Sequence, residues 1–232
     1  MKRWFSSYTS SALTIAAALT WLLAVGPQRG RADSDHSGED EASKARIGLK
    51  IAPVDLDYEH RDRNLVGYGS YLVNAVADCN GCHTHDASTQ YAPGGNLNLG
   101  QRPKKVNTGT YLGGGSDFGP VPAPGFAEIV SRNITPDKTG KPAGLKFVEF
   151  QEVIRKGTDF DNWHPTCSGP PNGHCVPAPF VGSLLLVMPW PAFQDMTEHD
   201  IRAIYEYLNS VPCLEGDPGN PAGADTKGKR CK

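Results

Sequence analysis

The sequence predicts a mostly α-helical domain, and three observations carry that prediction. Apolar residues recur at helical spacing in residues 65–77, 146–156 and 197–209. Glycine and proline crowd the segments that separate these ranges, and they interrupt long regular elements. Two of the ranges carry end signals of helices, an N-terminal capping box and a C-terminal glycine. We therefore expect a helical core joined by long loops.

The N-terminus has the layout of a signal peptide. Residues 1–3 are a short basic start, residues 11–25 are apolar, and residues 30–32 allow cleavage after Ala32. The apolar stretch is shorter than the roughly 20 residues that span a bilayer, and no later segment is apolar enough to do so. We predict that residues 1–32 are removed and that the protein is exported to the periplasm. An uncleaved anchor, which would place the protein at the membrane, is the alternative.

The length that remains indicates one domain, or one domain with a large insertion. Residues 1–32 hold four of the 23 basic residues and none of the 25 acidic ones, so removing them leaves a formal charge of −6. This mildly acidic balance argues against nucleic acid as a partner. Residues 33–46 are polar, acidic and free of large apolar side chains, which predicts a disordered lead-in. We treat residues 33–64 as this lead-in and an N-terminal extension.

The motif Cys79-Asn80-Gly81-Cys82-His83 indicates covalent haem attachment. Two thiols three positions apart on one helical turn can add to the two vinyl groups of one porphyrin. The histidine that follows offers a neutral nitrogen to the iron. A C-x-x-C pair alone also suits a redox dithiol or half of a zinc site. The adjacent His83 in an exported chain favours one covalently bound haem c, held by Cys79, Cys82 and His83.

The predicted helix over residues 65–77 leads directly into this motif. Gly69 would weaken an isolated helix, so we expect another helix to cross closely there. Residues 197–209 supply that helix, since Thr197 and Asp200 resemble a capping box and an apolar stripe follows them.

Between the motif and the last helix the sequence predicts less regular structure. A short helix is predicted over residues 146–156, where Gly157 is placed to end it. Residues 107–112 and 126–134 weakly resemble strands joined by a long loop.

Four cysteines lie outside the haem motif, and an even remainder in an exported chain predicts two disulfides. Three pairings are possible. We favour Cys167–Cys175 and Cys213–Cys231, because each closes a short loop rich in proline and glycine. A reactive or metal-binding thiol pair is the alternative.

The second iron ligand is predicted by elimination. Apart from Met1, which leaves with the signal peptide, the chain has Met188 and Met196. Met196 stands at a predicted helix start, whereas Met188 ends the apolar run 180–187 and precedes a stiff Pro-Trp-Pro segment. Apolar walls and a stiff backbone support a weak thioether ligand, and His/Met coordination is usual in cytochromes c. The alternatives are that Met188 only fills the core or that His164 is the ligand.

Some polar residues have both a functional and a structural interpretation. Arg132 and Trp190 could donate to haem propionates, or they could be structural. We interpret His85 as an exposed polar residue rather than a second metal site. We interpret residues 133–137 as a structural turn rather than a site for a propionate or a cation.

These features together resemble a class I c-type cytochrome. Narrower pieces resemble the cytochrome domains of periplasmic membrane-associated alcohol, aldehyde and sugar dehydrogenases and related single-domain bacterial cytochromes. Those pieces are Tyr71-Leu72-Val73-Asn74, the haem motif with Thr84, residues 133–137, and Met188-Pro189-Trp190-Pro191 with Met196-Thr197. The resemblance covers residues 65–212 as a cytochrome c domain and leaves residues 213–232 as a C-terminal tail.

The resemblance implies a helical fold around one haem c, with His83 and Met188 as iron ligands and a long Gly/Pro-rich insertion between them. It implies electron transfer from a periplasmic dehydrogenase or another redox donor to a membrane oxidase or quinone-linked complex. The dehydrogenase subunits usually carry three haem motifs, whereas this chain has one. We favour a non-catalytic electron carrier or cytochrome subunit. The alternative is a haem-based sensor or catalytic haem protein, which would need an open sixth position on the iron.

Overall fold

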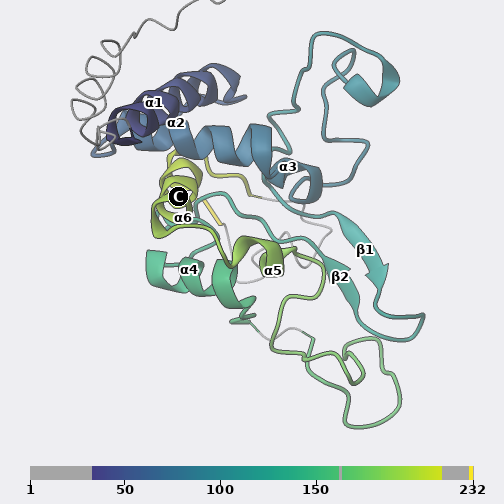
Figure 1. The fold of residues 1–232 in the computed structure, drawn as a ribbon. Coiled ribbons are helices and arrows are strands. Elements are labelled where there is room, and N and C mark those ends of the chain that lie inside the picture. Colours follow the sequence, from purple (N-terminus) through teal and green to yellow (C-terminus); the bar gives the residue numbers. More distant parts are fainter. Residues whose placement is uncertain (1–32, 162–163, 216–229, 232) are drawn as a thin grey trace, which may run out of the picture. The chain divides into compact units, whose positions relative to one another are not determined.

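The structure is a computed structural model that describes residues 33–161, 164–215 and 230–231. Most of the regular elements are helical, as predicted, and there is also a small two-stranded antiparallel sheet (Figure 1). In chain order the elements are α1 (Asp33–Ile51), α2 (Arg63–Tyr71), the π-helix η1 (Leu72–Val76), α3 (Cys79–Cys82), the 3₁₀-helix η2 (Leu97–Leu99), β1 (Asp117–Pro120), β2 (Glu128–Val130), α4 (Phe147–Lys156), α5 (Trp190–Phe193) and α6 (Glu198–Ser210). The predicted signal peptide lies outside the described residues. Within them, no helix combines the length and the apolar character that crossing a membrane requires.

The helix predicted before the haem motif is present as α2 and η1. α2 begins after Asp62, whose side chain accepts hydrogen bonds from the backbone N–H groups of Asn64 and Leu65. η1 continues it with π-helical backbone, and Asp78 then adopts a left-handed conformation (φ 45°) before α3 begins. This break lets the motif start a new helical turn instead of continuing the axis of α2.

The expected close crossing occurs at Gly69, where α2 packs against α6. A Cβ atom at Gly69 would lie 1.9 Å from the carbonyl oxygen of Ala203 and 2.8 Å from Cβ of Tyr207. Only glycine leaves room for that approach. Buried side chains of both helices, including Val66 and Ile201, form the core around the crossing.

α6 begins at the predicted capping box. Thr197 Oγ1 accepts a hydrogen bond from the N–H of Asp200 at 3.1 Å, and Asp200 Oδ2 accepts one from the N–H of Thr197 at 3.2 Å. The same carboxylate accepts a hydrogen bond from the hydroxyl of Tyr68 at 2.8 Å, which ties the start of α6 to α2.

Thr197→Ala should lower the free energy of unfolding by about 1 kcal/mol, because the N–H of Asp200 loses its acceptor. Thr197→Ser keeps an oxygen at that place and should stay within a few tenths of the unsubstituted protein. Denaturant unfolding of the three proteins gives the comparison. Equal losses in both variants would mean that the hydroxyl does not cap α6.

The short helix predicted over residues 146–156 is confirmed as α4. It ends at Gly157 in a left-handed conformation (φ 67°), as its sequence position predicts. Phe150 and Ile154 face the core, and the ring of Phe150 lies 5.4 Å from that of Tyr205 on α6. The buried apolar residues of α4 therefore pack on α6.

One sequence prediction near the N-terminus is wrong. Residues 33–46 were expected to be disordered, but they belong to α1. Ala45 is buried, and a Cβ atom at Gly48 would lie 1.9 Å from the carbonyl oxygen of Gly67 on α2. Ala45 and Gly48 thus let the backbone of α1 lie close to the backbone of α2, and this contact stabilises α1 although the segment has few large apolar side chains.

The predicted strands are only partly correct. Residues 107–112 are not a strand, because Asn107 accepts hydrogen bonds from Gly109 and Thr110 and folds the segment into turns. β1 instead lies at Asp117–Pro120 and pairs antiparallel with β2, which falls inside the second predicted strand. The side chain of Asn107 accepts a hydrogen bond from the N–H of Gly109, two residues on, and this local contact favours a turn over a strand.

Both predicted disulfides are present. Cys167 is bonded to Cys175 and Cys213 to Cys231. The first closes a proline-rich loop, and the second joins the end of α6 to the C-terminal tail.

Candidate functional site

The two cysteines of the motif lie on one helical turn, α3, and are not disulfide-bonded. Cys79 is partly buried and packs against the hydrophobic core, whereas Cys82 is exposed. The turn is fixed from the core side by Asn80, which is 4% exposed and whose Oδ1 accepts a hydrogen bond from the N–H of Leu112 at 2.9 Å. The two thiols are therefore presented together from one rigid turn.

His83 is held in one orientation by a backbone carbonyl. Its Nδ1 lies 2.7 Å from the carbonyl oxygen of Arg132, and because a carbonyl only accepts, Nδ1 carries the proton. Burial lowers the pKa of His83, the hydrogen bond to Arg132 opposes this effect, and the charge of Arg132 adds to it. The ring is thus neutral near pH 7, with an unprotonated Nε2 able to bind a metal. The sequence did not reveal this hydrogen bond, because every residue has a backbone carbonyl and the residue type does not show which one is the acceptor.

The backbone around His83 is anchored on both sides. The N–H of Gly114 donates to the carbonyl oxygen of His83 at 2.9 Å. Gly114 has φ 67°, and a Cβ atom there would lie 2.3 Å from the carbonyl carbon of Arg132. Glycine at this position therefore lets three segments meet: the haem motif, residues 113–115 and the carbonyl that orients His83.

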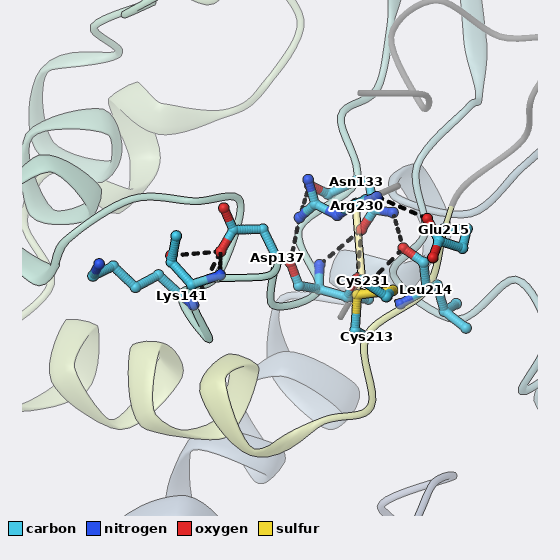
Figure 2. Close-up of a disulfide and its surroundings, with 10 residues drawn as sticks. Asn133, Asp137, Lys141, Cys213, Leu214, Glu215, Arg230 and Cys231 are labelled. Atoms are coloured by element: carbon cyan, nitrogen blue, oxygen red, sulfur yellow. Dashed lines mark hydrogen bonds between the residues drawn. A yellow bond between two sulfur atoms is a disulfide. The ribbon is translucent and has the colours of Figure 1, made fainter. Parts of the chain in front are cut away.

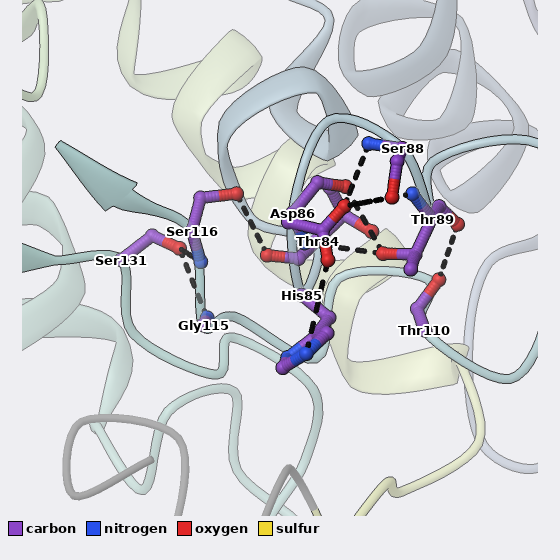
Figure 3. Close-up of polar contacts among 9 residues, drawn as sticks. All are labelled: Thr84, His85, Asp86, Ser88, Thr89, Thr110, Gly115, Ser116 and Ser131. Atoms are coloured by element: carbon purple, nitrogen blue, oxygen red, sulfur yellow. Dashed lines mark hydrogen bonds and ion pairs between the residues drawn. The ribbon is translucent and has the colours of Figure 1, made fainter.

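Hydrogen bonds connect the loop after His83 to the residue that precedes β1, as Figure 3 shows. The carbonyl oxygen of Thr84 accepts hydrogen bonds from both the N–H and the hydroxyl of Ser116, each at 2.9 Å. Ser131 Oγ in turn accepts from the N–H groups of Gly115 and Ser116 at 3.1 and 3.0 Å. The His85 side chain is partly exposed, and its Nε2 lies 3.8 Å from Asp86 Oδ2.

A second polar cluster joins Asn74 of η1, Tyr207 of α6 and Tyr111. The hydroxyls of Tyr111 and Tyr207 are 2.7 Å apart, and Tyr111 donates to Asn74 Oδ1 at 2.6 Å. Asn74 Nδ2 donates to the hydroxyl of Tyr207 at 3.1 Å. Burial raises the pKa of both tyrosines, so their hydroxyls stay protonated. The cluster is therefore an uncharged hydrogen-bond network that links η1 to α6.

The surroundings of Cys79 do not favour the redox-dithiol interpretation of the motif. Burial, with the nearby charge of Asp78, raises the pKa of Cys79 to about 12, whereas reactive dithiols have a lowered thiol pKa. Among the described residues, no group of three or more His, Cys, Asp or Glu side chains lies together as a metal site would need.

Met188 lies in a segment held by α4. The N–H of Leu185 donates to the carbonyl oxygen of Gly157 at 2.7 Å, and the indole of Trp190 donates to the carbonyl oxygen of Leu185 at 3.0 Å. The Trp190 ring covers Gly157, where a Cβ atom would lie 2.3 Å from it. Met188 and Met196 are both partly buried against the core. The choice of Met188 as the ligand stays a prediction.

Arg132 and Trp190 take part in protein contacts in this structure. Arg132 forms ion pairs with Asp159 and, at 3.2 Å, with Asp161. The Trp190 indole likewise has a protein acceptor, and donation by either side chain to a haem propionate stays a prediction. His164 is partly buried, and burial lowers its pKa.

The residues of the motif fit haem c. They offer two thiols on one turn and a neutral imidazole whose Nε2 makes no hydrogen bond to the described residues. Two buried polar atoms, Asn80 Nδ2 within the motif and Thr84 Oγ1 directly after it, have no partner among those residues. A buried polar atom without a partner costs about 1–3 kcal/mol, and a bound group with polar substituents would offset that cost.

The chain was compared with known proteins. No protein-family model matches it. The cytochrome c subunit of the alcohol dehydrogenase (quinone) of Gluconacetobacter polyoxogenes is 29% identical over 147 residues, 63% of this chain and 22% of that protein. The same subunit of Komagataeibacter europaeus gives the same figures. The fructose dehydrogenase cytochrome subunit of Gluconobacter japonicus is 23% identical over 164 residues, 71% of this chain and 25% of that protein.

The chain resembles the cytochrome c subunits of dehydrogenases. This confirms the family resemblance that the sequence motifs indicated. The chain spans about a quarter of the length of these curated relatives.

Proposed function

We propose that the protein is a single-haem c-type cytochrome that carries electrons in the periplasm, with a cytochrome c domain over residues 65–212. The observation that carries the proposal is the pairing of two unbridged thiols on α3 with a histidine whose Nδ1 is fixed by the Arg132 carbonyl. That hydrogen bond leaves Nε2 as a ligand, in the arrangement usual for metal-bound histidines.

Each residue then has a defined task. When bound, haem c supplies one-electron exchange between ferrous and ferric iron. Cys79 and Cys82 would hold it through thioether bonds, and His83 would supply one iron ligand through Nε2. Met188, presented by the segment that Trp190 and Gly157 hold in place, would supply the second iron ligand. Its thioether favours the ferrous state and raises the reduction potential.

The partners follow from the relatives. Their names describe cytochrome subunits of alcohol and fructose dehydrogenases. We infer that this protein accepts electrons from a periplasmic dehydrogenase and passes them to a membrane oxidase or a quinone-linked complex. With one motif, it would provide one step of that transfer.

Covalent attachment is the decisive test. Acid–acetone extraction of protein matured in a periplasm should leave the haem with the polypeptide. Cys79→Ser combined with Cys82→Ser should abolish retention, whereas Cys167→Ser combined with Cys175→Ser should keep it, because that pair is already a disulfide. Haem that passes from the unsubstituted protein into the organic phase would refute the proposal.

A further inference from the structure

The C-terminal tail returns to a segment near the site (Figure 2). Cys231 is bonded to Cys213, and this bond places Arg230 beside residues 133–135. Arg230 is 9% exposed, and its Nη2 donates to the carbonyl oxygens of Thr135 and, at 3.3 Å, of Asn133. A buried guanidinium that binds two backbone carbonyls fixes their positions, because leaving either without a donor is costly.

Leu214, which follows α6, also forms hydrogen bonds with residues 133–135. Asn133 Nδ2 donates to the carbonyl oxygen of Leu214 at 2.9 Å, and the N–H of Leu214 donates to Thr135 Oγ1 at 3.1 Å. The N–H of Arg230 donates to Glu215 Oε2 at 2.8 Å, which closes the set (Figure 2). Asn133 and Thr135 are 4% and 0% exposed. The tail and residues 133–135 therefore form one interlocked unit.

Residues 133–135 directly follow Arg132, whose carbonyl group orients His83. The carbonyl of Arg132, which accepts the hydrogen bond from His83 Nδ1, belongs to the planar peptide that joins Arg132 to Asn133. Gly114 packs directly against that peptide, with a Cβ position 2.4 Å from the N atom of Asn133. Any movement of Asn133 must therefore rotate or displace the carbonyl that His83 uses.

We propose that Arg230, held in place by the Cys213–Cys231 disulfide, is a positioning residue for the axial histidine. The proposal rests on the proposed function, in which His83 binds the haem iron. A firm Nδ1–H···O=C hydrogen bond makes the imidazole more basic and so favours ferric iron, and such second-shell hydrogen bonds are among the groups that set a haem potential. Weakening the hold of the tail on Asn133 should therefore favour ferrous iron.

The test compares matched variants of the haem-loaded protein. Arg230→Met removes the donors at similar length, and Cys213→Ser with Cys231→Ser frees the tail. Both should raise the ferrous-to-ferric ratio at a fixed ambient potential about two- to tenfold, an upward shift of roughly 20–60 mV. Both should also speed solvent exchange of the His83 Nδ1 proton, followed by NMR in the ferrous state. Arg230→Lys, which keeps a cationic donor, should lie closer to the unsubstituted protein.

Two controls separate positioning from general loss of stability. Cys167→Ser with Cys175→Ser opens the other disulfide, and Arg202→Gln removes an exposed ion pair with Glu198. Both should leave the potential and the exchange rate unchanged. An unchanged potential and exchange rate in loaded Arg230→Met and in the tail-disulfide variant would overturn the proposal.

If neither tail variant matures with haem, the loaded Cys167→Ser, Cys175→Ser protein provides the same test. Reducing it with a phosphine and alkylating the thiols opens only the tail disulfide, and the same upward shift is expected. No shift there would overturn the proposal. Acid–acetone extraction is run first on each sample, so failure of covalent attachment, which contradicts the proposed function, is distinguished from an unchanged potential, which contradicts this inference alone.

Discussion

Replacing Met188 by alanine is expected to lower the reduction potential and to abolish the weak far-red absorption band that an iron–sulfur bond produces. Axial ligands set haem potentials over a range of about 0.8 V, and we expect a fall on the order of 0.1 V from losing the thioether. The opened position should then bind water or carbon monoxide. Met188→His should keep the iron six-coordinate but also lower the potential, because imidazole favours ferric iron more than a thioether does.

The contacts around Met188 are consistent with the proposed role as a ligand. The segment from Leu185 to Trp190 is short, and Gly157 holds both of its ends. The N–H of Trp190 donates to the carbonyl oxygen of Met188 itself at 2.8 Å. A thioether is a weak ligand, so a backbone that presents it with little loss of entropy increases its occupancy.

Met196→Ala is the matched control, since Met196 is also partly buried against the core but directly precedes the capping residue of α6. It should keep both the band and the potential. Loss of both in Met196→Ala, with Met188→Ala unchanged, would reverse the assignment. If neither variant changes them, the ligand is not methionine, and His164 is the first residue to test. Carbon monoxide binding to the unsubstituted protein would favour the alternative of a sensor or catalytic haem protein.

Local signals account for what the sequence predicted well. Thr197 and Gly157 each mark a helix end through a hydrogen bond or a backbone angle that depends on one residue type. The two disulfides likewise join cysteines that are 8 and 18 positions apart in the chain. Such features depend on neighbours in sequence, so a single chain reveals them.

The features that the sequence did not reveal depend on contacts between distant segments. The acceptor for His83 is a backbone carbonyl 49 positions away in the chain, and Arg230 lies 97 positions from Asn133. α1 was missed for a related reason. Its stability comes from close backbone contact at Gly48, which composition cannot show.

Gly69→Ala is expected to have the largest effect on stability of any single change considered. A methyl group at this position would lie 1.9 Å from the carbonyl oxygen of Ala203. In an open helix the same change would gain about 1 kcal/mol from helix propensity. Here α2 and α6 must move apart, and the loss should be about 3 kcal/mol or more, at the upper end of what overpacking costs.

The clash involves backbone, and this gives the test its controls. Adding Ala203→Gly should not rescue Gly69→Ala, because the carbonyl oxygen remains where it is. Gly169→Ala, at a position where a Cβ atom meets nothing within 4 Å, should leave stability nearly unchanged. Denaturant unfolding of the haem-loaded proteins measures the differences. Because α2 and η1 lead directly into Cys79, separating α2 from α6 should also lower the yield of covalently bound haem. A Gly69→Ala protein with full stability and full haem content would mean that the two helices do not cross at this distance.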